Sequence, residues 1–154
     1  MFIKNIIQRK GSEVISVEPK CTVSEVARLL AERRIGAVLV MEGEKLVGVL
    51  SERDVVRGGA ISGGSILNES VESLMTKTIV TCTLHQHVNE ILTLMTERRI
   101  RHLPVIEEGK LVGMISIGDL VYARINEVEQ EADALKTYNA NALVCLHIRY
   151  SCGA

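Results

Sequence analysis

The fold is decided by a stretch that occurs twice in the sequence, as GVLSERD at residues 48–54 and as GMISIGD at residues 113–119. Each copy ends an apolar run that predicts a strand and then places a Ser three residues before an Asp. Asp is a common helix N-cap, so one copy alone would indicate only the start of a helix. Two copies that both keep Gly, Ser and Asp favour a shared role in ligand binding, because glycine allows a ligand to approach the backbone closely.

These stretches belong to a longer internal duplication. When the numbering is shifted by 65, 16 of the 35 positions between residues 23 and 57 are identical to residues 88–122. Identity of this extent indicates a repeat, and each copy reads strand, helix, strand, strand, helix. One copy offers only a three-stranded sheet with two helices, which is too little for an independent core. We therefore expect an α/β (α+β) protein whose two units pack about a pseudo-twofold axis, with both repeated stretches at the crevice between them.

The same patterns predict where the parts of the chain begin and end. An apolar helix at residues 2–8 leads the first unit, and the glycine-rich run at residues 58–65 predicts a flexible connection to a second leading helix at residues 71–75. The predicted divisions are residues 1–60 for the first unit with its leading helix, 61–70 for a linker, 71–124 for the second unit, and 125–154 for a C-terminal helix and tail.

The predicted C-terminal helix has an apolar face of its own. Its apolar residues alternate steps of four and three, which is the spacing of a seam between two packed helices; they are Val121, Ile125, Val128, Ala132 and Leu135. A helix with such a seam either folds back on the core or pairs with a second helix. We favour pairing, and hence a homodimer. No pattern supports a prediction for residues 141–154.

Composition excludes several classes of function. The formal net charge is −1 and the pI is about 6.4, so no overall basic field attracts nucleic acid or an anionic membrane. No apolar run is long enough to span a membrane, and the first residues lack the features of a signal peptide, so we expect a cytoplasmic protein. The cysteines lack metal-ligand spacing, and Cys145 and Cys152 would pair only in an oxidising medium.

The sequence also gives no support for a catalytic site or a metal site. It contains no strand-turn-helix nucleophile, no Cys-His pair and no pair of acids arranged for general acid-base catalysis, so we expect a protein that is not an enzyme. His85, His87 and Glu90 suggest a metal site at first sight. Alternate residues diverge at the start of a helix, however, and a third ligand at suitable spacing is missing. We therefore predict no metal site.

At this point the residues of the repeat resemble a known family, the CBS domain. The resemblance rests on Met75-Thr76, ERRI at residues 97–100, RHLPVI at 101–106, LVGMIS at 111–116, and Asp119. It covers residues 14–57 in the first unit and 75–122 in the second. It implies a CBS pair, a pseudo-symmetric disk that binds adenosine-containing ligands in its cleft and reports energy or redox state to a protein partner.

The resemblance also implies roles for particular residues. In the family the Asp of the repeated stretch takes the two ribose hydroxyls, and the preceding Ser lies beside the ribose and phosphate. A carboxylate can accept from two hydroxyl donors at once. The adenine lies between apolar side chains and backbone before and within a strand. In this chain the ribose and phosphate positions are Asp54, Asp119, Ser51 and Ser116, and the adenine positions are Ile15, Gly36, Ala37, Val80 and Ile100.

Phosphate contacts are expected from Arg53, Arg101 and His102, so the two pockets should differ in affinity. These cations favour a phosphorylated ligand over S-adenosylmethionine. AMP is the preferred candidate because a cleft with few cations neutralises a triphosphate poorly, and ATP or NAD(H) are the other candidates. The rival interpretation is a structural protein-interaction module whose cleft binds nothing.

Overall fold

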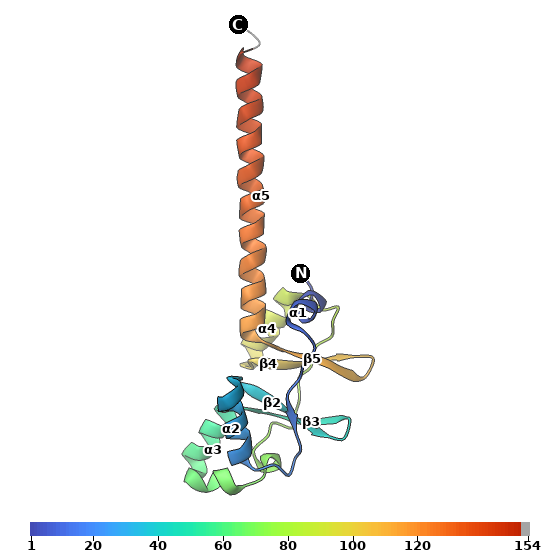
Figure 1. Ribbon diagram of the computed structural model, residues 1–154, viewed down its shortest axis with the longest axis vertical. Coiled ribbons are helices and arrows are strands. Elements are labelled where there is room, and N and C mark those ends of the chain that lie inside the picture. Colours follow the sequence, from blue (N-terminus) through green and yellow to red (C-terminus); the bar gives the residue numbers. More distant parts are fainter. Residues whose placement is uncertain (152–154) are drawn as a thin grey trace.

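The computed structural model describes residues 1–151 of the chain, with side chains for residues 1–138. It is a mixed α/β protein with two small sheets, flanking helices and one long helix that projects from the globular part (Figure 1). In chain order the elements are α1 (Ile3–Lys10), β1 (Ser16–Val17), α2 (Val23–Arg33), β2 (Ala37–Glu42), β3 (Lys45–Ser51), α3 (Glu52–Ser62), the 3₁₀ turns η1 (Gly63–Asn68) and η2 (Val71–Ser73), α4 (Val88–Arg98), β4 (His102–Glu107), β5 (Lys110–Ser116) and α5 (Ile117–Ser151).

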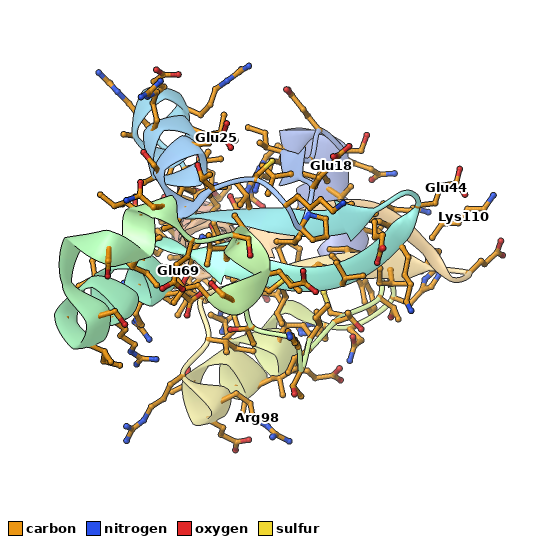
Figure 2. All side chains as sticks on the ribbon, turned by 90° about the horizontal axis from the view of Figure 1, so that it is seen from below. Glu18, Glu25, Glu44, Glu69, Arg98 and Lys110 are labelled. Carbon is orange, nitrogen blue, oxygen red and sulfur yellow. The ribbon has the colours of Figure 1, made fainter. Side chains whose placement is uncertain are left out.

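The two β-hairpins repeat each other residue by residue. Ala37 of β2 faces Ser51 of β3, and 65 positions later His102 of β4 faces Ser116 of β5. Both hairpins shift register at the equivalent place, and both extend in the same direction away from the helices (Figure 1, Figure 2). The duplication inferred from the sequence is therefore present in the structure.

The second sheet has two strands, although the sequence predicts three in each unit. In the first unit β1 pairs in parallel with β2, and the N–H of Leu39 donates to the carbonyl of Ile15 at 3.2 Å. Pro104 occupies the position of Leu39 in the second unit and has no N–H to donate. The segment before α4 meets β4 at an isolated bridge between Cys82 and Val105 and forms no strand.

The connection between the units is helical, which corrects the expectation of a flexible linker. α3 continues to Ser62 and is followed directly by η1, so the glycines of residues 58–65 lie within helices. Gly58 is buried, and a Cβ at this position would lie 2.7 Å from Leu74 Cδ1. This glycine allows close packing rather than flexibility. The helix predicted at residues 71–75 is only the short turn η2.

Helix α1 precedes the first unit in the sequence but packs on the second. Ile3, Ile6 and Ile7 are buried in the core formed with α4, β4 and β5. Ile7 fits against Gly113, where a Cβ would lie 2.8 Å from Ile7 Cδ1, and the N–H of Ile3 donates to the Gln86 carbonyl at 3.0 Å. The helix that leads residues 1–60 therefore completes the core of the other unit.

We expect Ile3→Ala to lower the free energy of unfolding by about 2–4 kcal/mol, because it opens a cavity in the second core. Ile3 is fully buried, whereas Ile61 on α3 is 86% exposed and serves as the matched control. Ile61→Ala should change stability by less than about 0.5 kcal/mol. Urea unfolding followed by circular dichroism compares the two variants. Equal, small effects would contradict the packing of α1 on the second unit.

The last helix, α5, begins on the second core and continues well beyond it (Figure 1). Leu120 and Ala123 are fully buried. The apolar seam lies on another side of the helix and is exposed to 44–63% at Val121, Ile125, Val128 and Leu135. The helix continues through residues 141–151, where the sequence made no prediction, and the Cys145–Cys152 pair falls outside the described side chains. Within the described residues no helix has the length and apolar character needed to cross a membrane.

Candidate functional site

Residues of both units line a cavity of about 400 Å³, which we call the Asp54 pocket. Its volume is typical of sites for small molecules. The first unit supplies the start of α3 and the turn before β2, and the second supplies the segment before α4 and the end of that helix. The walls consist of Gly36, Val49, Ser51, Glu52, Arg53, Asp54, Arg57, Thr76, Thr78, Ile79, Val80, Arg98, Arg99, Ile100, Arg101 and His102.

Most of the residues proposed from the sequence for a nucleotide site line this pocket. They are Gly36, Ser51, Arg53, Asp54, Val80, Ile100, Arg101 and His102. The other four do not line it. Ala37 is fully buried in the sheet, Ile15 packs against the first core, and Ser116 and Asp119 lie at the start of α5.

Asp54 is held by the first turn of α3. The N–H and the hydroxyl of Ser51 both donate to Asp54 Oδ2, at 2.8 and 2.9 Å, and the N–H of Asp54 comes within 3.3 Å of Ser51 Oγ. This arrangement is a capping box, so Asp54 does stabilise the start of the helix, as the sequence indicated. All hydrogen bonds that the described residues make to this carboxylate fall on Oδ2. Oδ1 is therefore available to a ligand hydroxyl, and the cap fixes the orientation of the side chain.

Five arginines surround the same pocket, which corrects the premise that the cleft contains few cations. Arg53 and Arg101 were predicted from the sequence; Arg57, Arg98 and Arg99 were not. The acidic side chains in the lining are Glu52 and Asp54, so positive charge prevails. Nothing in the spacing of Arg98 and Arg99 indicates that α4 ends at a cavity. Figure 2 shows Arg98 at that end of α4.

Arg53 also joins the two units across the pocket. Its Nη1 donates to the carbonyl oxygen of Arg99 at 3.2 Å. Arg99 ends α4 in the left-handed conformation, with φ of 55°, and this turns the chain from the helix toward β4. A guanidinium at a helix C-terminus is also favoured by the helix dipole. Arg53 therefore connects the start of α3 to the end of α4 on either side of the space that a ligand would enter.

His102 lies at the boundary between the pocket and the second repeated stretch. It lines the pocket near Gly36, where a Cβ would lie 2.9 Å from His102 Cε1, and it pairs with Ser116 across the hairpin. Burial lowers the pKa of His102 below its ordinary value of 6.5, and the positive charge of Lys10 lowers it further. At neutral pH the ring is uncharged. The neutral ring can donate a hydrogen bond from its N–H to a phosphate oxygen, but it does not supply the positive charge expected from the sequence.

The lowered pKa of His102 predicts a loss of stability in weak acid. Between pH 7.5 and 5.5 the unfolded chain takes up a proton at this residue that the folded protein resists, so stability should fall as the pH falls below about 6.5. His102→Asn should flatten this dependence, whereas His85→Asn, at a side chain 74% exposed, should not. Urea midpoints at pH 5.5, 6.5 and 7.5 measure the effect. A slope unchanged by His102→Asn would contradict it.

Asp119 repeats the cap geometry of Asp54 at the start of α5. The N–H of Ser116 donates to Asp119 Oδ2 at 2.8 Å, and the N–H of Asp119 donates to Ser116 Oγ at 3.2 Å. A further contact comes from helix α1, whose Lys10 Nζ lies 2.7 Å from Asp119 Oδ2. The two repeated stretches therefore have the same backbone geometry, but the residues that surround their carboxylates differ.

Groups that could serve other chemistry are occupied in structural contacts. In the described part of the chain, no three His, Cys, Asp or Glu side chains are arranged to hold a metal ion. His85 lies 3.3 Å from Glu107, while His87 accepts a hydrogen bond from the N–H of Asn89 at 3.3 Å. Burial raises the pKa of the Cys82 thiol to about 12, which leaves it protonated and unreactive at neutral pH.

Comparison with known families supports the resemblance seen in the sequence. The CBS domain matches this chain twice, at residues 3–60 and at residues 71–126. The chain belongs to the CBS-domain family. It contains two CBS domains in tandem, which together form one CBS pair.

Two relatives match most of this chain. The CBS domain-containing protein CBSX3, mitochondrial, of Arabidopsis thaliana is 32% identical over 145 residues, which cover 88% of this chain and 70% of the relative. The crystal structure of the CBS-domain containing protein ATU1752 from Agrobacterium tumefaciens is 40% identical, with a TM-score of 0.79, and the match covers 80% of this chain and 99% of that one. Both comparisons support the CBS-pair architecture.

A more distant CBS pair shares the fold alone. The CBS domain pair of protein MJ0100, solved in complex with 5-methylthioadenosine and S-adenosyl-L-methionine, has a TM-score of 0.73 and 19% identity. That match covers 82% of this chain and 98% of the other.

Proposed function

We propose that this CBS pair is a regulatory protein that binds a phosphorylated adenine nucleotide in the Asp54 pocket. The observation that carries the proposal is the combination of a capped carboxylate with a free oxygen, apolar side chains and five arginines around one cavity. Asp54 would accept hydrogen bonds from the ribose hydroxyls, and Val80 and Ile100 would hold the adenine ring. The arginines would contact the phosphates.

The charge of the pocket refines the choice of nucleotide. AMP was preferred on the premise of few cations, but each of the five arginines can pair with phosphate oxygens. We therefore propose that ADP, ATP or NAD(H) binds more tightly than AMP, and that S-adenosylmethionine, which carries no phosphate, binds more weakly than any of them. The MJ0100 pair, a fold neighbour described with two adenosine compounds, supports adenosine as the common part of the ligand.

Helix α5 would transmit the effect of ligand binding to a partner. This helix starts at the second repeated stretch and exposes an apolar seam of heptad-like spacing, at Val121, Ile125, Val128 and Leu135. We propose that it pairs with α5 of a second copy, and that ligand binding between the units changes how the seam is presented to that copy or to a regulated protein. Light scattering after size exclusion should give the mass of two chains, and the mass of one would exclude the homodimer.

We assign the protein no enzymatic activity of its own, and a cytoplasmic location stays a prediction from the sequence. Isothermal titration of nucleotide-free protein with AMP, ADP, ATP, NADH and S-adenosylmethionine tests the binding proposal. We expect micromolar binding of at least one phosphorylated ligand. Binding of none of them would favour the rival interpretation, a structural interaction module with a non-functional cleft.

A further inference from the structure

The two copies of the repeated stretch differ in what surrounds the carboxylate. Lys10, the last residue of α1, donates from Nζ to Asp119 Oδ2 at 2.7 Å and to the carbonyl oxygen of Met114 at 3.1 Å. At Asp54, by contrast, the hydrogen bonds from the described residues come from Ser51 of its own stretch. One carboxylate is thus held by a cation from another element, and the other is not.

The Lys10–Asp119 ion pair is partly shielded from water. The two side chains are 38% and 24% exposed. Burial raises the pKa of Asp119, but hydrogen bonds from Lys10 and Ser116 outweigh burial and keep that pKa below its ordinary value. The carboxylate is therefore ionised at neutral pH and already engaged. A ribose diol would have to displace an ammonium group before it could bind there.

The second site also lacks counterparts of three arginines of the first. Three of the five arginines of the Asp54 pocket have uncharged counterparts 65 positions away: Arg53 corresponds to Gly118, Arg57 to Tyr122 and Arg101 to Gly36. The Tyr122 ring is in turn covered by the guanidinium of Arg9, 4.7 Å from its centroid. Arg9 and Lys10, the cations of α1 near this site, are engaged with Tyr122 and Asp119, so phosphate groups would find fewer available partners here than in the Asp54 pocket.

We propose that each chain binds a single nucleotide, in the Asp54 pocket, and that Lys10 closes the equivalent position at Asp119. This inference rests on the proposed function and adds to it the number of ligands and the residue that limits it. Asp119 then has a structural role, because its ion pair with Lys10 holds the end of α1 against the first turn of α5. Lys10 acts on the site by occupying its carboxylate, not by contacting the bound nucleotide.

The number of nucleotides bound per chain tests whether Lys10 blocks the position at Asp119. Isothermal titration with ATP and, separately, with AMP should give one equivalent per chain for the native protein and for Asp119→Asn, with a Kd changed less than about two-fold. Lys10→Met should reveal a second equivalent at least about ten-fold weaker than the first, while Lys4→Met, at an exposed lysine of the same helix, should keep one.

Each other outcome has a separate meaning. Two equivalents for the native protein, one of them lost in Asp119→Asn, would overturn the inference and leave the proposed function intact. One equivalent for Lys10→Met at saturating ligand would show that Lys10 does not close the site. No binding by any variant would reject the proposed function, and the inference with it.

The structural role of the Lys10–Asp119 ion pair can be measured without a ligand. Lys10→Met and Asp119→Asn should each lower the Tm, and the double variant should lower it no further than the larger single effect, because both remove the same ion pair. Asn at position 119 keeps an oxygen for the Ser116 N–H, so the helix cap is retained. Lys4→Met should leave the Tm unchanged. Independent, additive decreases would contradict the ion-pair assignment.

Discussion

Asp54→Asn should weaken nucleotide binding by roughly 100-fold. A carboxylate accepts from both ribose hydroxyls, whereas an amide offers one acceptor and no charge. Hydrogen bonds to charged groups contribute about 1.5–3 kcal/mol each, and about 2.7 kcal/mol corresponds to 100-fold in Kd. Asparagine keeps an oxygen that can accept from the N–H and the hydroxyl of Ser51, so the cap and the fold should be preserved.

Asp119→Asn is the matched control, because it makes the same chemical change in the same backbone geometry. Competition against a fluorescent adenine nucleotide measures both variants, and circular dichroism checks that both are folded. Equal losses for the two variants would mean that the pockets are equivalent. If Asp54→Asn bound as well as the native protein, Asp54 would be only a helix cap.

The second large effect concerns the arginines of the pocket. The double variant Arg57→Gln/Arg101→Gln should weaken ATP binding by about ten-fold and AMP binding by less, because charges facing the outer phosphates are lost. An exposed ion pair contributes about 0.2–1 kcal/mol, so two together account for this factor. Arg53 is left in place because it also fastens α3 to the end of α4.

Arg28→Gln on α2 supplies the control for net charge, since Arg28 is exposed and does not line the pocket. Affinities for AMP, ADP and ATP are compared at 50 and 200 mM salt. Native affinity should rise with the number of phosphates and fall with salt, most steeply for ATP. Equal losses for AMP and ATP in the double variant would show that the two arginines do not face the outer phosphates.

Local patterns in the sequence predicted the parts of the molecule that depend on local interactions. The strict 65-residue offset predicted both hairpins, and the Ser-x-x-Asp spacing predicted the start of α3 and of α5. The missing third strand was foreseeable from Pro104 alone, because a proline cannot provide the N–H that Leu39 donates in the first unit.

Features that depend on contacts between the units were not predictable in this way. Amphipathic spacing showed that α1 has an apolar face but not that this face covers the second core, and Lys10 gave no sign of a partner 109 positions away. Nothing in the sequence around Arg98 and Arg99 indicates that these two side chains line a pocket. Their place beside Asp54 follows from the way the two units close on each other, which no single stretch encodes.

The most direct test is a titration of ¹⁵N-labelled protein with ATP, followed by ¹H–¹⁵N correlation spectra. We expect the largest shift changes at the amides of residues 51–54, 78–80 and 99–102, which line the Asp54 pocket, and much smaller changes at residues 116–119. Changes centred on residues 116–119, or none at saturating ATP, would contradict the account.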